Sequence, residues 1–163
     1  MINFYTSENG SLCQRDEPET GCWISVVDPT PEEVRELIEV YGLDSGFVKS
    51  SIDEEESSRI EREDDQTLII IDTPVSAVDD DKTRNFYTMP MGIIITEEYV
   101  FTISIKETQI IKEAERGGIR NLRPSFKTRF VLQLLLRIAS FCAIDGYTEL
   151  LDELYSAELI TLS

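Results

Sequence analysis

The chain has 163 residues, which suits a single domain that buries about 70% of the surface of its unfolded chain. Its formal net charge is -17, from 32 acidic and 15 basic residues. This charge argues against a nucleic-acid partner and is compatible with binding cations. Three cysteines and no histidine offer neither a disulfide framework nor a tetrahedral zinc site, so a reducing, cytoplasmic compartment is expected.

Neither a signal peptide nor a membrane span is visible. The first residues, MINFYTSENGSL, lack a basic region followed by an apolar run. A bilayer span needs roughly 20 apolar residues, and the best stretch, residues 130–136, is interrupted by Gln133 and flanked by Arg129 and Arg137. The sequence as given is therefore expected to be soluble.

The first part of the chain is predicted to form three strands and a helix. Residues 2–6 and 11–15 are predicted strands, joined by the turn residues 8–10, and residues 22–27 form a third strand that ends before Pro29. A helix then follows, because Thr30 can cap it, Pro31 suits its first position and Glu33 completes a capping box. Gly42 is the expected end of this helix.

The middle of the chain is predicted to contain a short helix and three strands. The helix begins at residues 43–45 and carries Phe47 and Val48 on one face, and the acidic run 53–56 is its end and a loop. Residues 67–71 are almost continuously apolar, which predicts a strand at the centre of the sheet. Residues 79–82 form a polar turn before strands at 86–96 and 99–105, so part of the sheet is antiparallel.

The last third is predicted to be helical. One helix spans residues 107–116 and ends at Gly117-Gly118, and the longest helix runs from Pro124 to about Phe141. Gly146 is a predicted break before a weaker helix at 147–160.

No catalytic constellation is visible, since the sequence has no histidine, no GxSxG elbow and no Walker loop. Cys22, inside a strand, is interpreted as a buried structural thiol. Acidic clusters at 53–56, 61–65 and 79–81 could hold Mg²⁺ or Ca²⁺, although each is also explained as a solvated face. A basic cluster, consisting of Arg120, Arg123, Lys127 and Arg129, could dock an acidic neighbour or a phosphate, but is better explained as balancing the domain's own carboxylates.

Several segments in series resemble the CorA family of divalent-cation transporters. The matching segments are GCWISVVDPTPEEVREL (21–37), YGLDSGFV (41–48), DEEESSRIERED (53–64), TLIIIDTPV (67–75), MPMGIIITEEYVFTIS (89–104) and RPSFKTRFVLQLLLRIAS (123–140). The resemblance implies a cytoplasmic α/β domain, with an α+β tendency, in which helices cover both faces of a mixed parallel and antiparallel sheet. Residues 1–122 would form this domain, and residues 123–163 a helical segment packed on it.

The resemblance also implies a function. Members of the family are homopentameric membrane transporters of Mg²⁺, and in some cases of Co²⁺, Ni²⁺ or Zn²⁺, whose transmembrane helices end in a Gly-Met-Asn motif after a long stalk helix. Neither feature is present in this sequence. The chain is therefore expected to be the cytoplasmic regulatory portion of such a transporter, without enzymatic activity.

The resemblance suggests where a regulatory ion would bind. In the family, Mg²⁺ held between carboxylates of adjacent cytoplasmic domains stabilises the closed pore, and one carboxylate comes from a neighbouring stalk helix. By position, Asp79, Asp80 and Asp81 are the candidate Mg²⁺ ligands of the α/β domain. Only weak binding is expected, because the stalk partner is missing and Mg²⁺ keeps several of its waters.

Three questions stay open at the level of sequence. Residues 141–163 depart from the family pattern, and an excised fragment, an altered reading frame and a genuine variant all fit. A free-standing α/β ligand-binding or regulatory protein without transport activity is the first alternative function. A hydrolase with an acidic metal site is the second.

Overall fold

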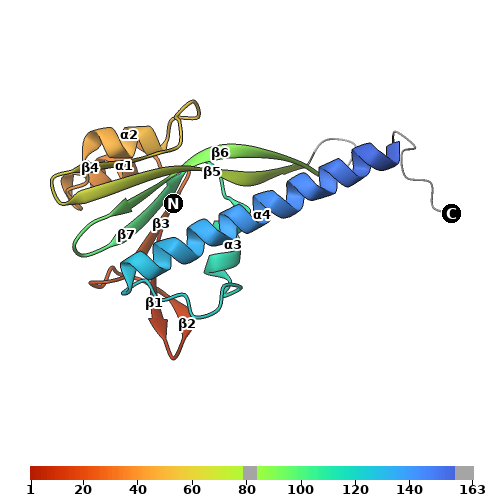
Figure 1. Cartoon of the computed structure of the whole chain (residues 1–163). Helices are drawn as coiled ribbons and strands as arrows, with labels where there is room; N and C mark the ends of the chain where they lie inside the picture. The colour runs from red at the N-terminus through yellow and green to blue at the C-terminus, as the bar shows by residue number, and fades with distance from the viewer. Residues whose placement is uncertain (79–83, 157–163) are drawn as a thin grey trace.

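The computed structural model describes residues 1–78 and 84–156, and the side chains of residues 1–76 and 87–143 within them. Seven strands form one sheet, and helices lie on both of its faces (Figure 1). The strands are β1 (Ile2–Glu8), β2 (Ser11–Arg15), β3 (Trp23–Val27), β4 (Arg59–Glu63), β5 (Gln66–Val78), β6 (Arg84–Ile95) and β7 (Val100–Ser104). The helices are α1 (Pro31–Glu39), α2 (Ser45–Ser51), α3 (Gln109–Glu115) and α4 (Lys127–Ser156).

The sheet is mixed, as the sequence predicts. Its strand order is β2-β1-β3-β7-β6-β5-β4, and every neighbouring pair is antiparallel except β3 and β7. The parallel pair requires a long crossover, because parallel strands cannot be joined by a tight turn. Helices α1 and α2 and the meander β4-β5-β6 all lie within that crossover.

Helices α1 and α2 cover one face of the sheet. The capping box that opens α1 is confirmed, because the Glu33 amide donates to Thr30 Oγ1 at 3.2 Å and the Thr30 amide donates to Glu33 Oε2 at 2.9 Å. Gly42 has φ +68, the left-handed conformation expected after the helix. The core on this face includes Leu37 from α1 and Phe47 from α2, together with Cys22, whose thiol is fully buried as predicted.

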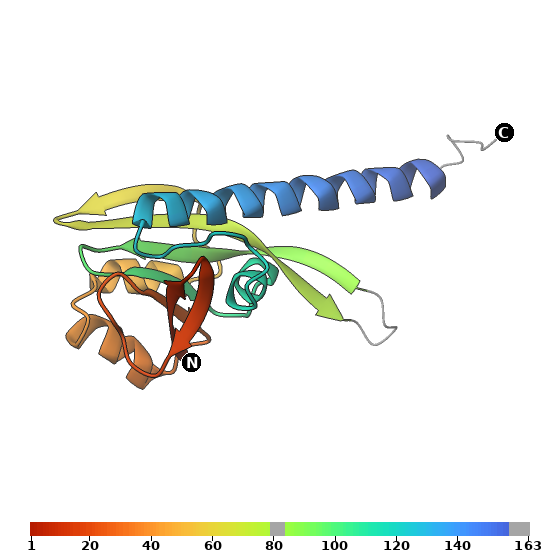
Figure 2. The ribbon, with the colours of Figure 1, turned by 90° about the horizontal axis from the view of Figure 1, so that it is seen from below.

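Helices α3 and α4 cover the opposite face. Trp23 of β3 is at the centre of this core, with its ring centroid 5.0 Å from that of Tyr5 and 5.4 Å from that of Phe130 on α4. The buried indole Nε1–H donates to Thr102 Oγ1 at 2.8 Å, which satisfies the polar atom that a tryptophan brings into a core. The N-terminal half of α4 is thereby fixed against the sheet (Figure 2).

The predicted position of the apolar strand 67–71 was wrong. Strand β5 is not central, because β4 pairs along its outer side with Arg59 opposite Ile70 and Glu63 opposite Gln66. Strand β4 was missed because its sequence, RIERE, has no apolar alternation and its residues are largely exposed. Strand β5 is nevertheless apolar along its length because Leu68 and Ile70 face one core while Ile69 and Ile71 face the other.

The predicted break at Gly146 was also wrong. Helix α4 continues without interruption from Lys127 to Ser156 and includes residues 147–156 of the segment predicted as a separate helix. Residues 157–160 of that segment lie outside the described residues. A glycine inside a helix costs only about 1 kcal/mol relative to alanine, which the surrounding helix-forming residues can offset. In both views the last part of α4 extends past the described ends of strands β5 and β6 (Figures 1 and 2).

Candidate functional site

The predicted Mg²⁺ ligands, Asp79, Asp80 and Asp81, lie outside the described residues. The structure describes the chain up to Val78 and again from Arg84, and these two residues are paired at the end of the β5-β6 hairpin. The hairpin is the longest in the sheet and carries its two strands away from the core (Figure 2). The assignment of Mg²⁺ to the three aspartates stays a prediction.

The acidic cluster at 53–56 is partly neutralised by a single arginine. Arg59 Nη1 lies 2.5 Å from Glu56 Oε1, Arg59 Nε lies 3.1 Å from Glu61 Oε2, and Nη2 donates to Ser50 Oγ at 3.1 Å. Hydrogen bonds with Ser50 and Arg59 hold the pKa of Glu56 below its usual value. This arginine therefore links the end of α2 to strand β4 and brings two of the predicted acidic clusters together.

The remaining acids of the second cluster lie at a turn. Glu63 ends β4, and Asp64 and Asp65 connect it to β5, with Asp64 at φ +51. Within residues 1–78 and 84–156, no three cysteine or carboxylate side chains converge in a way that could hold a metal ion. The two described clusters thus create negative potential and do not assemble a multidentate site.

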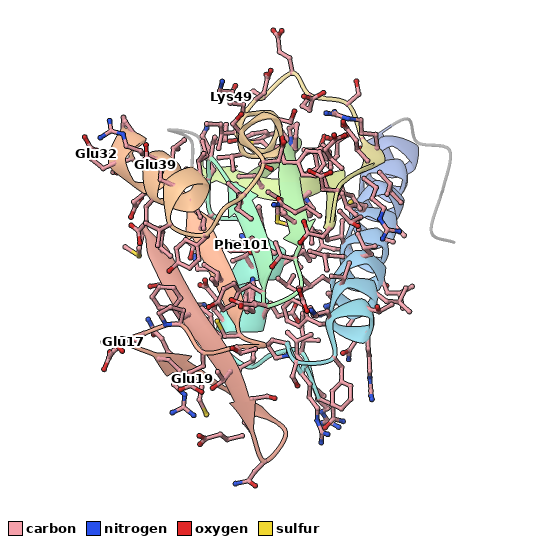
Figure 3. All side chains as sticks on the ribbon, turned by 90° about the vertical axis from the view of Figure 1, so that its left-hand side faces the viewer. Glu17, Glu19, Glu32, Glu39, Lys49 and Phe101 are labelled. Carbon is pink, nitrogen blue, oxygen red and sulfur yellow. The ribbon has the colours of Figure 1, made fainter. Side chains whose placement is uncertain are left out.

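Acidic side chains are widely distributed over the surface. Figure 3 shows Glu17 and Glu19 at one end of the domain and Glu32 and Glu39 at α1, all exposed, while Phe101 is fully buried in the sheet. Such a distribution raises the local concentration of cations around the whole domain.

Sequence reasoning missed one carboxylate in an unusual environment, Glu115 at the end of α3. Its Oε1 accepts a hydrogen bond from Ser25 Oγ at 2.7 Å. Burial raises the pKa of Glu115, the charge of Glu107 raises it further, and hydrogen bonds from Ser25 and Tyr5 partly oppose this rise. Burial and the neighbouring Glu115 in turn raise the pKa of Tyr5 to about 12. No sequence signal identified Glu115, because its burial comes from strands β1 and β3.

Glu115 lies in the wall between two clefts. One cleft, of about 450 Å³, is lined by the β1-β2 turn and the residues after α3, including Arg116 and Arg120. The other, of about 470 Å³, is lined by Asp28 and Glu107 with the N-terminus. The second cleft is acidic, so it favours small cations or polar neutral molecules over anions.

Whether the basic cluster balances the carboxylates of the domain stays a prediction, because its contacts among the described residues are few. Lys127 Nζ donates to the backbone carbonyl oxygen of Thr96 at 2.9 Å and to that of Glu97. Arg120, Arg123 and Arg129 are exposed and form no ion pair with any part of the chain that the structure describes.

Among the helices in the described ranges, none combines the length and apolar composition required of a transmembrane segment.

The chain matches the model of a known protein family. The family described as "CorA-like Mg2+ transporter protein" matches residues 18–156. No curated protein matches the chain.

Solved structures show the same fold. The complete CorA magnesium transporter from Methanocaldococcus jannaschii is similar with a TM-score of 0.70 and 22% identity, and the match covers 100% of this chain and 52% of that chain. The soluble domain of CorA from the same organism has a TM-score of 0.67 and 24% identity, covering 96% and 65%. The ZntB cytoplasmic domain from Vibrio parahaemolyticus has a TM-score of 0.63 and 14% identity, covering 93% and 62%. The chain thus spans about half of the complete transporter to which it is similar.

Proposed function

Since the chain belongs to the CorA-like Mg2+ transporter family, we propose that it acts as the Mg²⁺-sensing, regulatory domain on the cytoplasmic side of a divalent-cation transporter. The family match over residues 18–156 is the observation that carries this proposal. The fold shared with the soluble domain of the M. jannaschii transporter supports it. In this role the domain binds and positions ions and catalyses no reaction.

The charge of the domain gives a physical basis for sensing. A net charge of -17 makes close packing of several such domains unfavourable unless cations neutralise part of it. Mg²⁺ between neighbouring domains would hold them together, and its loss would let them move apart. In the proposed assembly, a homopentamer, this separation is coupled to opening of the pore.

Asp79, Asp80 and Asp81 are the proposed contribution of this domain to the ion site. They follow Val78, at the end of a hairpin in which β5 and β6 are paired from Thr67 and Ile95 to Val78 and Arg84. Consecutive carboxylates provide the hard oxygen ligands that Mg²⁺ prefers. Without a second domain to complete the coordination, weak binding is expected.

The test measures the thermal midpoint of the chain with MgCl₂ and with NaCl at equal ionic strength. A larger rise with MgCl₂ is expected, and the triple variant Asp79→Asn, Asp80→Asn, Asp81→Asn should lose this excess. The matched control replaces three acids at another hairpin turn, with Glu63→Gln, Asp64→Asn and Asp65→Asn. This control should keep the larger rise in thermal midpoint with MgCl₂. Equal effects of the two salts on the original chain would rule out specific sensing, and an unchanged Mg²⁺ excess in the triple variant would place the ion elsewhere.

The transport assignment has an independent test. The gene sequence beyond codon 163 should encode two apolar segments and a Gly-Met-Asn triplet. If such segments are absent, the protein acts as a free-standing regulatory or ligand-binding domain.

A further inference from the structure

The basic residues of the chain are concentrated in one segment. Eight of the 15 lie between residues 106 and 137, and the same segment contains only three of the 32 acids. It comprises helix α3, the loop after it and the first part of α4. Its net charge is therefore positive, while the rest of the chain is strongly acidic. An anion that approaches this domain meets its most favourable potential near α3.

A cleft of about 450 Å³ lies between this segment and the β1-β2 turn. Gly10 and Ser11 belong to one wall, and the other is formed by the end of α3 and the loop after it, with Arg116 and Arg120. The two walls approach at one point, where a β-carbon built on Gly10 would be 3.4 Å from Asn121 Oδ1. Figure 1 shows the β1-β2 hairpin beside the loop that leads from α3 to α4. The volume is in the range of small-molecule sites.

The loop that carries Arg120 has a fixed backbone. The carbonyl oxygen of Arg120 accepts a hydrogen bond from Gln133 Nε2 of α4 at 3.3 Å. Leu122, two residues further on, is fully buried in the core between the sheet and α4. At the other end of the loop, Gly117 terminates α3 with φ +75. A ligand that binds here therefore meets a wall that is already in place, which lowers the entropic cost of binding.

The carboxylates closest in sequence to the cleft are bound to cations of their own. Glu113 of α3 accepts two hydrogen bonds from Arg137 of α4, at 2.9 and 2.5 Å. Glu8, at the end of β1, forms an ion pair with Arg15 of β2. The negative charge on both sides of the cleft is thus partly neutralised, which reduces its repulsion of an anion.

Glu115 is the acidic residue in the wall of this cleft. Its Oε1 accepts a hydrogen bond from Ser25 Oγ of β3, so this oxygen is directed toward the sheet. Burial raises the pKa of Glu115, which favours its neutral form more than in an exposed carboxyl group. Glu115 therefore opposes an anion in the cleft less than an exposed glutamate would.

We propose that this cleft binds the phosphate group of a small organic phosphate. The two arginines supply planar guanidinium groups, which match phosphate oxygens with paired hydrogen bonds, and a phosphate monoester has nearly two negative charges at neutral pH. Ser11 and Asn121 add a hydroxyl and an amide donor to the lining of the cleft. Leu12 and Ile119 also line it and give the organic part of the ligand an apolar surface.

Isothermal titration calorimetry of the full chain, in a buffer without divalent cations, tests the proposal with AMP as the probe. AMP should bind, adenosine should not, because it lacks the phosphate, and inorganic phosphate should compete with AMP. The affinity for AMP should fall as the NaCl concentration rises. A chain that binds neither AMP nor inorganic phosphate at concentrations up to about 10 mM would overturn the proposal. Adenosine binding as tight as that of AMP would also overturn it.

Substitutions in the cleft separate specific binding from general attraction by positive charge. Arg116→Gln and Arg120→Gln should each weaken AMP binding by about tenfold or more, because each removes charge-assisted hydrogen bonds. Glu115→Gln should strengthen it, since it removes the negative charge from the wall. The matched control is Arg123→Gln, at an exposed arginine of the same loop that does not line the cleft in the described part of the chain. If this control weakens AMP binding as much as Arg116→Gln does, the cleft is not the site.

The amide resonances of the glycines in an ¹⁵N-labelled sample locate the bound ligand. Gly10 and Gly117 line the cleft, whereas Gly42 follows α1 on the opposite face of the sheet. AMP should shift the resonances of Gly10 and Gly117 and leave that of Gly42 in place. AMP binding without a shift at Gly10 or Gly117 would place the ligand elsewhere and overturn the proposal.

Phosphate binding in this cleft does not depend on transport or on Mg²⁺ sensing. The AMP titration contains no divalent cation, and its variants leave the β5-β6 hairpin unchanged. Either proposal can therefore fail while the other holds.

Discussion

Gly92 of β6 lies so close to Ser51 of α2 that no other residue fits there. A β-carbon built on Gly92 would be 1.9 Å from Ser51 Oγ, 2.4 Å from its Cβ and 3.1 Å from its Cα. Ser51 is itself fixed, because it is buried and its hydroxyl donates to the Phe47 carbonyl oxygen at 2.7 Å. Direct packing of the α2 backbone on the sheet therefore requires glycine at this position.

Gly92→Ala should accordingly destabilise the fold by about 3 kcal/mol or more, because α2 would have to move away from the sheet. Urea unfolding followed by circular dichroism measures this change. Gly42→Ala is the comparison: nothing lies within 4 Å of the added carbon, and only the φ of +68 opposes it, so about 1 kcal/mol is expected. If the two variants lose similar stability, the close approach of α2 to β6 is not what requires Gly92.

The contact of Gly92 with Ser51 also shows what sequence could and could not predict. The capping box of α1 was predicted because Thr30 and Glu33 are three residues apart, and both of its hydrogen bonds are present. Residues that meet across the chain leave no such local pattern. Neither the Gly92–Ser51 contact nor the hydrogen bond from Trp23 to Thr102 could be read from the sequence.

The difference between local sequence patterns and contacts made across the chain also explains which strands and which site residues could be predicted. Strand β4 is held by pairing with β5, and its own residues carry no strand signal, so it was missed and β5 was placed too centrally. Glu115 lies on α3, and its hydrogen-bond partner Ser25 is 90 residues away in the chain. The three aspartates at 79–81 were chosen by resemblance and lie outside the described residues.

Arg59→Gln should change the response of the domain to ions. Arg59 pairs with Glu56 and Glu61, and its loss leaves two carboxylates at the α2–β4 junction without their cation. We expect a small fall in thermal midpoint at low ionic strength that disappears in high salt, since exposed pairs are screened. We also expect MgCl₂ to raise the midpoint more in this variant than in the original chain.

The matched control for this prediction is Arg62→Gln. Arg62 is an exposed residue of the same strand and forms no ion pair with the described residues, so its removal changes the charge equally. Identical responses of the two variants to MgCl₂ would show that total charge matters and that the contacts of Arg59 do not.

Glu115→Gln should make the domain less sensitive to pH. Burial raises the pKa of Glu115 in the folded state above its ordinary value of 4.5, so the folded protein favours the protonated form. The stability that this group contributes is complete below about pH 4.5 and is lost as the pH rises through the raised pKa. Glutamine cannot lose a proton and can still accept the hydrogen bond from Ser25. The thermal midpoint of the variant should therefore exceed that of the original chain increasingly as the pH rises, and the difference should level off above the raised pKa.

Thermal unfolding from about pH 4 to about pH 8 measures this difference, because the interval spans the ordinary and raised values of a carboxyl pKa. Glu32→Gln removes an exposed carboxylate and serves as the control, with no such growing difference. Tyr5→Phe keeps the ring but removes a hydrogen bond that lowers the pKa of Glu115, so the loss of stability should move to higher pH. A difference that is constant with pH, or one that grows toward acid, would show that the fold does not raise the pKa of Glu115.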